Sequence, residues 1–505
     1  MKRLSQWFSG LNPHGYLRLV VLAVIVLTFA NLLLSAASFE IGMGYPSIVA
    51  GPGDRFGDLV KFSLSYKKFT SGIGNGEKYR SWAQTYKHYY ESNEYGGKEH
   101  FGERSKITHF HVPPFSTLLF LGAAMFIAAT NSVYPVMLVF FLFYLLLALW
   151  TVEGSVPEEK RSWKLRLAFC FFVILSYPAL TVFSRANYHA GFTSLLVIAF
   201  LFSVFGRKQA SWIEFLTLAI AINIRPNAAI FALAIPLLLG LKQSFAPLLK
   251  IAVSSTGIFF VSYVAVHALY PDYTLQYFYR GVADYNQKYV VGDWGAGGNN
   301  SLYGIIQNFN QLDTDKVTFY LAGLLLVLLI GPIIWAGRRV KRWTVTGPLI
   351  LLTVECVAIC LGYHKYSMVL FQLLALVVVA LVGWSLFRSP DRLLAAPFLL
   401  TSLYCLLTPV FAPYHLLVFV APLFLVYFDA EHWLDHSRMF SIIALACVLM
   451  LSPKNYIFGG SDSPQVVLNP LLLFVLTLAL AAEILNSPEW AKLRALSKLS
   501  RDQLA

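Results

Sequence analysis

Long apolar runs separated by short polar connections dominate the chain. The first run extends from Leu19 to Phe39 and carries no charged side chain between Arg18 and Glu40. A helix needs roughly 20 mostly apolar residues to cross a hydrocarbon core about 30 Å thick. The apolar region of a cleavable signal peptide, which is the alternative, is usually only about 7 to 15 residues long. The pattern therefore predicts an uncleaved membrane anchor whose N-terminal side lies in the cytoplasm.

Further apolar segments follow a polar stretch at 40–106. They lie at about 113–130, 133–152, 167–184, 192–206, 213–241, 251–270, 317–336, 344–363, 368–386, 393–410, 412–428, 439–452 and 468–485. Their length and spacing predict an all-α polytopic integral membrane protein with about 12–14 transmembrane helices.

The short connections decide which way the segments run, because cytoplasmic loops carry an excess of Lys and Arg near helix ends. If 113–130 crosses the membrane, the basic connection at 158–164 and the pair Arg207-Lys208 both fall outside. If 113–130 only dips into the outer face, both basic groups are cytoplasmic, and we prefer this second topology. Proline disfavours a continuous helix, so Arg225-Pro226 predicts that 213–241 is a short hairpin with its tip on the outer side.

Residues 1–486 are predicted to form one transmembrane domain, because no linker or change of composition divides them. Its main outer loops are expected at 40–112 and 271–316, with a shorter one at 453–467. Leu59, Phe62, Tyr66 and Phe69 recur at helical spacing in the first loop, which predicts an amphipathic helix on the outer membrane surface. The tail at 487–505 is predicted to be a cytoplasmic amphipathic helix, and a solvated charged tail is the alternative.

Composition agrees with the apolar pattern. The chain of 505 residues is 57% hydrophobic and only 13% charged, with a mean hydropathy of +0.62, which excludes a water-soluble protein. A formal net charge of +13 would ordinarily suggest nucleic acid. Most of the basic excess falls in predicted cytoplasmic connections, so it reflects topology. The five cysteines all lie in apolar runs and predict neither a disulfide framework nor a metal site.

Candidate chemistry lies in the outer segments. Asp58 stands at the start of the predicted amphipathic helix, where a carboxylate can cap the helix or act at the boundary between lipid and water. Arg185, Arg225 and His415 are all predicted at outer helix ends, a suitable depth for a phosphate at the membrane interface.

Several short stretches carry a family likeness between residue 58 and about residue 422. They are Asp58-Leu59-Val60-Lys61-Phe62, His111-Val112-Pro113-Pro114-Phe115, Arg185-Ala186-Asn187-Tyr188-His189-Ala190-Gly191, Ile224-Arg225-Pro226, Gly298-Asn299-Asn300-Ser301-Leu302-Tyr303-Gly304 and Thr408-Pro409-Val410-Phe411-Ala412-Pro413-Tyr414-His415. In this order they resemble the membrane-embedded family 87 glycosyltransferases, which have the GT-C architecture and take a sugar from a polyprenyl-phosphate donor on the outer face of the membrane.

The resemblance implies a GT-C-like bundle with Asp58 and His415 as catalytic residues. The implied substrate-binding residues are Asp54, His111, Arg185, Asn187, Arg225, Asn299, Asn300, Ser301 and Tyr414. Arg225 stands where the family usually has lysine, and Asn300 stands where it usually has glutamine. No metal or other cofactor is expected. The expected partners are the lipid-linked donor, a lipid or glycan acceptor and membrane lipids.

The chemistry of sugar transfer from a phosphate donor is consistent with these residue roles. Transfer from a sugar phosphate passes through an oxocarbenium-like state, and a carboxylate opposite the leaving group can accept the proton of the acceptor hydroxyl. The departing phosphate gains charge that cations and hydrogen-bond donors stabilise.

We therefore expect an inverting transferase of a single sugar, with mannose the best guess. The expected location is a bacterial inner membrane, with the site facing the periplasm and both termini cytoplasmic. A lipid-linked polysaccharide polymerase or ligase, using a diphosphate-linked glycan, is the main alternative. A transporter or flippase is a further one.

Replacement of the predicted base tests this expectation. Asp58→Asn should lower transfer about 100-fold or more, because general acid–base catalysis contributes about 10²–10⁴-fold, while the folded protein still binds donor. Product formation and donor binding by the purified variant are the measurements. Unchanged turnover would remove Asp58 from the mechanism.

Overall fold

The computed structural model describes residues 22–28, 30, 59, 112–130, 132, 134–208, 210–271, 273–291, 299–304, 382, 392–428, 437–452 and 465–485. The predicted apolar segments at 317–336 and 344–363 and the predicted tail lie outside the described residues. Of the segment at 19–39, only residues 22–28 and 30 are described, and the segment at 368–386 and the first outer loop lie almost wholly outside the described residues.

Within these ranges the regular structure is helical, with no strand. The longer helices are α7 (Pro114–Thr130), α8 (Tyr134–Ser155), α9 (Trp163–Leu175), α10 (Tyr177–Arg185), α11 (Tyr188–Leu201), α12 (Trp212–Ile224), α13 (Ala234–Leu239), α14 (Phe245–Leu269), α15 (Leu275–Tyr285), α20 (Arg392–Leu407), α21 (Val420–Phe428), α22 (Ser437–Leu451) and α24 (Gln465–Leu485). Short 3₁₀ or π elements are η2 (Glu158–Lys160), η3 (Phe202–Gly206), η4 (Pro226–Leu233), η5 (Leu241–Gln243), η6 (Asn286–Val291) and η9 (Pro413–Phe419).

Three of the described helices are long and apolar enough to cross a membrane. They are α8 with 22 residues, α11 continued through η3 with 19, and α14 with 25. A fourth span results if α9 and the first residues of α10, bent by 56° at Ser176, count as one. These helices confirm a multi-pass membrane protein built from helices. The number of 12–14 crossings stays a prediction.

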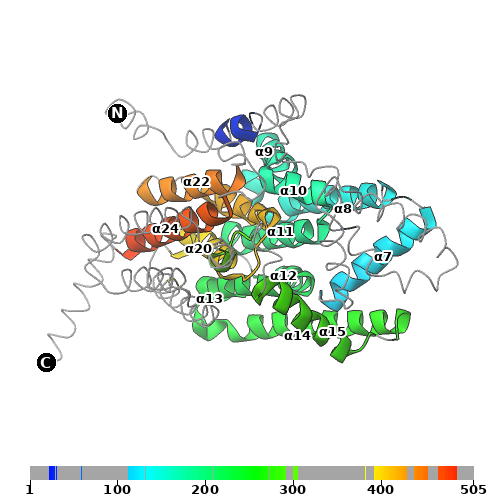
Figure 1. Ribbon diagram of the computed structural model, residues 1–505. Helices are drawn as coiled ribbons and strands as arrows, with labels where there is room; N and C mark the ends of the chain where they lie inside the picture. Colours follow the sequence, from blue (N-terminus) through cyan, green and yellow to red (C-terminus); the bar gives the residue numbers. More distant parts are fainter. Residues whose placement is uncertain are drawn as a thin grey trace, which may run out of the picture.

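Helix α11 is the centre of the bundle. All of its residues are buried, and it packs against α8, α10, α12 and η9. Figure 1 shows α8 and α10 on one side of α11 and α12 on the other. Gly191 allows this close packing, because a Cβ there would lie only 3.0 Å from both Tyr144 Cε2 on α8 and Val182 Cγ1 on α10. Small residues serve the same purpose between membrane helices generally.

The bundle has two ends, which we name after Tyr188 and Arg207. At the Tyr188 end, the start of α11 meets the start of α8, where the Tyr188 hydroxyl donates to the Met137 carbonyl at 3.4 Å. At the Arg207 end, the Arg207 guanidinium donates to the Gly154 carbonyl in the last turn of α8. Helices α8 and α11 therefore run the full distance between the two ends.

Helix α7 begins and ends at the Tyr188 end. In its first turn, the Ser116 hydroxyl donates to the Ile224 carbonyl at the end of α12, at 3.0 Å. After its last residue, Thr130, the chain enters α8 at Tyr134, also at the Tyr188 end. Figure 1 shows α7 tilted across the other helices on that side. Whether this segment crosses the membrane or dips into one face stays a prediction.

The break at Arg225-Pro226 forms the predicted hairpin. Helix α12 ends at Ile224, η4 packs back against α12, and α13 returns to contact η3 near the Arg207 end. The prediction for 213–241 is confirmed in this respect.

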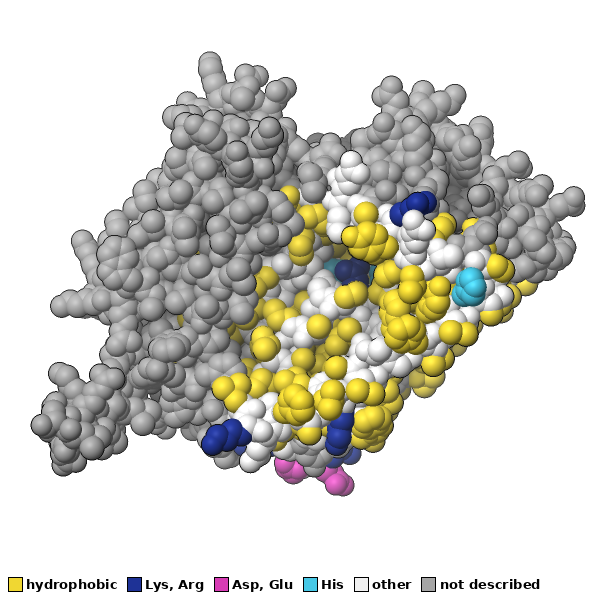
Figure 2. All heavy atoms as spheres, turned by 90° about the horizontal axis from the view of Figure 1, so that it is seen from below, with side chains coloured by type: hydrophobic (Ala, Val, Ile, Leu, Met, Phe, Trp, Pro, Cys, Tyr) yellow, Lys and Arg dark blue, Asp and Glu magenta, His cyan; other side chains and the backbone are white. Residues whose placement is uncertain are grey.

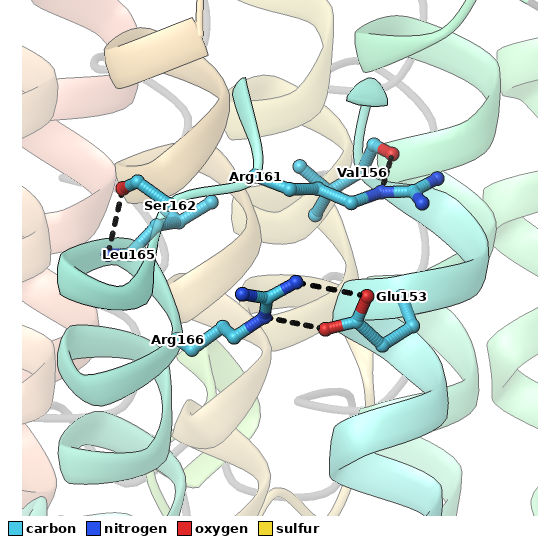
Figure 3. Close-up of polar contacts among 6 residues, drawn as sticks. All are labelled: Glu153, Val156, Arg161, Ser162, Leu165 and Arg166. Atoms are coloured by element: carbon cyan, nitrogen blue, oxygen red, sulfur yellow. Dashed lines mark hydrogen bonds and ion pairs between the residues drawn. The ribbon is translucent and has the colours of Figure 1, made fainter. Parts of the chain in front are cut away.

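Polar contacts secure the connection between α8 and α9 at the Arg207 end (Figure 3). Arg166 Nε lies 2.6 Å from Glu153 Oε1 and Nη2 lies 3.2 Å from Oε2. Arg161 Nε donates to the Val156 carbonyl at 3.0 Å, and the Ser162 hydroxyl caps α9 by accepting from Leu165 N at 3.2 Å. Because the Arg166–Glu153 pair is exposed, it contributes little to stability, and the cap and the backbone contact define the loop.

Basic residues are distributed unequally between the two ends. The described Lys and Arg residues in and beside the connections at the Arg207 end are Lys160, Arg161, Lys164, Arg166, Arg207, Lys208, Lys242 and Lys250. Those at or beyond the Tyr188 end are Arg185, Arg225, Arg280 and Lys288. The Arg207 end is therefore the more basic one.

Cysteine labelling tests the course of α7. In a protein whose five native cysteines are replaced, His111→Cys and Ser132→Cys should react with a membrane-impermeant maleimide from the same side. Lys160→Cys, beyond α8, should react only from the opposite side. Labelling of residues 111 and 132 from opposite sides would show that α7 crosses the membrane.

Candidate functional site

Arg225 and His189 meet at the Tyr188 end. Because the residue before a proline avoids helical dihedrals, Pro226 holds Arg225 in an extended conformation (φ −141°, ψ 109°) and ends α12 there. Arg225 Nη2 then lies 3.4 Å from His189 Nε2. A guanidinium only donates hydrogen bonds, so His189 accepts at Nε2 and carries its proton on Nδ1.

The start of α11 presents His189. Ala186 between α10 and α11 is left-handed (φ 54°, ψ 37°), a conformation that costs a non-glycine residue about 1–2 kcal/mol. This turn lets Asn187 cap α11, its Oδ1 accepting from Ala190 N at 3.3 Å. His189 is therefore fixed in the first turn of a fully buried helix.

A second histidine reaches the same region from η9. His415 is 1% exposed, and its ring packs against Phe411 and Tyr414, with ring centroids 5.2 Å and 4.6 Å away. Neither ring nitrogen of His415 has a hydrogen-bond partner among the described residues. The Tyr414 ring that packs against His415 also lies beside the Arg225 guanidinium, and Arg225 contacts His189, so the three side chains belong to one site.

Tyr404 completes the arrangement from the last turn of α20. Its hydroxyl is buried and has no hydrogen-bond partner in the described part of the chain, and its ring lies 5.2 Å from the ring of Phe411, which also packs against His415. The Arg225 guanidinium carbon also lies 5.9 Å from the centre of the Tyr414 ring, at its face. We call His189, Arg225, Tyr404 and His415 the basic cluster.

The basic cluster combines positive charge with unused hydrogen-bonding capacity. Among the described residues, the buried Arg225 Nε has no acceptor, and neither Arg225 nor His415 has a carboxylate partner. A buried polar group without a partner costs about 1–3 kcal/mol, so such groups call for an explanation. On the face that Figure 2 shows, a basic side chain with a histidine beside it is set back among hydrophobic and uncharged side chains. An anion with several acceptor oxygens is the ligand that this chemistry suits.

The structure brings together three residues predicted from the sequence, namely Arg225, His415 and Tyr414. Asn187 caps α11 two residues before His189 of the basic cluster. Arg185 is the last residue of α10 at the same end.

Asn299, Asn300 and Ser301 lie close by, fully buried, and bind the protein itself. Asn299 Nδ2 donates to the Pro409 carbonyl at 2.7 Å, and Asn300 N donates to the Phe411 carbonyl at 2.7 Å. The Ser301 hydroxyl contacts Asn299 Oδ1 at 2.9 Å. Their role in substrate binding stays a prediction, and their observed hydrogen bonds hold the turn before η9.

Asp54, Asp58 and His111 lie outside the described residues, and their predicted roles stay predictions. Sequence reasoning missed Tyr404 and did not select His189 as a site residue. His189 belongs to the Arg185–Gly191 stretch, which supplied a signal. Tyr404 lies inside an apolar helix, where no sequence pattern distinguishes it from the hydrophobic core.

Within the described ranges, no group of three or more His, Cys, Asp or Glu residues is placed to hold a metal ion. No family model, no curated protein and no solved structure matches the chain.

Replacement of His415 tests whether its imidazole lacks hydrogen-bond partners, as it does among the described residues, when no ligand is bound. His415→Leu should raise the free energy of unfolding by about 1 kcal/mol or leave it unchanged, because an apolar side chain removes the cost of an unpaired buried polar group. Thermal unfolding in detergent measures the change.

Asn223→Leu is the matched control. This buried amide is satisfied, with Nδ2 2.9 Å from the carbonyls of Ala219 and Ser255. Its replacement should destabilise the protein by about 1–3 kcal/mol, since it leaves buried acceptors unpaired. A similar loss in both variants would show that His415 is already satisfied.

Proposed function

We propose that the protein is a membrane glycosyltransferase that takes a single sugar from a polyprenyl-phosphate donor, and that the donor phosphate binds at the basic cluster. The observation that carries the proposal is the set of buried polar atoms, Arg225 Nε, both ring nitrogens of His415 and the Tyr404 hydroxyl, that have no hydrogen-bond partner among the described residues. A phosphate monoester offers several anionic acceptor oxygens and pairs well with arginine. The resemblance of the sequence to family 87 glycosyltransferases supports the sugar as the transferred group.

The basic ends of the helices support the orientation. Lys and Arg near short connections mark the cytoplasmic side, so the Arg207 end is placed in the cytoplasm and the Tyr188 end on the outer, periplasmic side of a bacterial inner membrane. The basic cluster then faces the outer leaflet, where the head group of a lipid-linked sugar would stand and its polyprenyl chain would remain among the exposed apolar side chains.

Each residue has a distinct task in this proposal. Arg225 and the Tyr404 hydroxyl donate to the phosphate oxygens, and these bonds strengthen as the sugar leaves and the phosphate gains charge. His415 donates a further hydrogen bond from one ring nitrogen. Asp58 accepts the proton of the acceptor hydroxyl, which attacks the anomeric carbon from the face opposite the phosphate.

A binding experiment tests the phosphate site. Farnesyl phosphate, a short polyprenyl monophosphate, should bind the purified protein, and farnesol, which lacks the phosphate, should not compete. Arg225→Ala should weaken binding about 10- to 100-fold, because hydrogen bonds to charged groups are worth about 1.5–3 kcal/mol. Tyr404→Phe should weaken it less. Arg166→Ala, an exposed arginine of the opposite end, is the control that should leave binding unchanged.

The choice of donor separates the proposal from its alternatives. Incubation with polyprenyl-phosphate hexoses and a membrane extract of acceptors should give a glycosylated product that Arg225→Ala reduces. Tighter binding of farnesyl diphosphate than of the monophosphate would favour a polysaccharide polymerase or ligase. Equal binding by wild type and Arg225→Ala would overturn the placement of the phosphate.

A further inference from the structure

A short turn, residues 408–412, joins α20 to η9 and leads directly into His415. We call it the Pro409 turn. His415 N donates to the Ala412 carbonyl at 3.0 Å, and the Phe411 ring packs 5.2 Å from the imidazole. The turn therefore fixes both the backbone and one aromatic neighbour of His415.

Asn299 binds the Pro409 turn through both atoms of its amide. Nδ2 donates to the Pro409 carbonyl at 2.7 Å, and Oδ1 accepts from Phe411 N at 2.9 Å. Asn300 N adds a third bond, to the Phe411 carbonyl at 2.7 Å. An amide offers a donor and an acceptor side by side, so one side chain satisfies two backbone groups two residues apart.

Two neighbours hold Asn299 in this position. The Ser301 hydroxyl lies 2.9 Å from Asn299 Oδ1 and accepts from Gly304 N at 3.0 Å. At Gly304, an added Cβ would lie only 2.3 Å from the Asn299 carbonyl oxygen. A side chain at residue 304 would therefore displace the backbone of Asn299.

The Pro409 turn has one further described tie on its other side, where Asn227 Nδ2 donates to Thr408 Oγ1 at 3.2 Å. Asn227 lies two residues beyond Arg225, in η4. The turn is thus held between the loop of Asn299 and the segment that carries Arg225, which sets the spacing between His415 and Arg225.

We propose that Asn299 is a positioning residue that holds the Pro409 turn so that the His415 ring stays beside Arg225. The consequence for phosphate binding rests on the proposed function, whereas the positioning itself does not. Asn299 acts through the turn, and His415 is the residue that meets the ligand.

Chemical modification of His415 measures the positioning without any ligand. Diethyl pyrocarbonate modifies accessible imidazoles, and mass spectrometry of peptides reads His415 and His189 separately. Asn299→Ala should raise the modification rate of His415 about tenfold relative to His189, because loss of the two hydrogen bonds between the Asn299 amide and the Pro409 turn lets the turn open locally. Gly304→Ala should have the same effect with the Asn299 amide intact. Asn223→Ala, which removes a buried amide that bonds Ala219 and Ser255, should leave the ratio unchanged.

Ser301→Ala is a milder variant that keeps the proposal testable if Asn299→Ala does not fold, and it should raise the ratio by a smaller factor. Unchanged ratios in the folded Asn299, Ser301 and Gly304 variants would overturn the positioning role. An equal rise at His415 and His189 with a lower unfolding temperature would also overturn it, since it would indicate a general loss of structure.

Farnesyl phosphate binding separates this inference from the proposed function. If Asn299→Ala binds farnesyl phosphate more weakly and also raises the modification rate of His415 relative to His189, both the positioning role and the phosphate site are supported. If Asn299→Ala raises the modification rate of His415 relative to His189 but the wild-type protein does not bind farnesyl phosphate, the positioning role is supported and the phosphate site is rejected. Undiminished binding in Asn299→Ala with a raised ratio would show that the turn does not serve the ligand, and would overturn its proposed role there.

Discussion

The complete burial of α11 is the constraint on which the rest of the structure depends. Every residue of this mostly apolar helix is buried against other parts of the chain, so the neighbouring elements must pack closely around it. Helices α8, α10 and α12 and the short η9 supply that enclosure, and Gly191 lets two of them approach within contact of the backbone. The ends of these neighbours are thereby brought together at the first turn of α11.

Helix ends carry the polar groups that helix interiors do not. Backbone carbonyls and amides remain unpaired there, and the chain satisfies them with Ser116 at the end of α12 and Asn187 at the start of α11. The same convergence places Arg225 beside His189 in surroundings that otherwise consist of hydrophobic side chains. A chemically active site can form at this end because the packing of α11 fixes every element that contributes to it.

Much of this arrangement could be predicted from the sequence, and the limit has a physical reason. Apolar length predicted the helices, and Arg225-Pro226 predicted the hairpin, because both signals act locally. The sequence left two courses open for 113–130, because the contact of Ser116 with Ile224 joins residues 108 positions apart and no local pattern predicts such a contact. Tyr404 could not be recognised, because its phenol looks like any other aromatic ring of a buried helix until the position of Arg225 is known.

The buried residues of the motifs fall into two groups. Some form their hydrogen bonds within the protein and others have polar atoms left over, and the degree of burial is the same in both groups. Asn299 and His415 are equally hidden, at 0% and 1% exposure. Both polar atoms of the Asn299 amide form hydrogen bonds to the Pro409 turn, whereas neither ring nitrogen of His415 forms a hydrogen bond to a described residue. Since an unpaired buried group is costly, the proposed phosphate would supply the partner that the described residues do not give His415. The Asn299 side chain already has its hydrogen-bond partners within the protein, and it serves the site by keeping His415 in place.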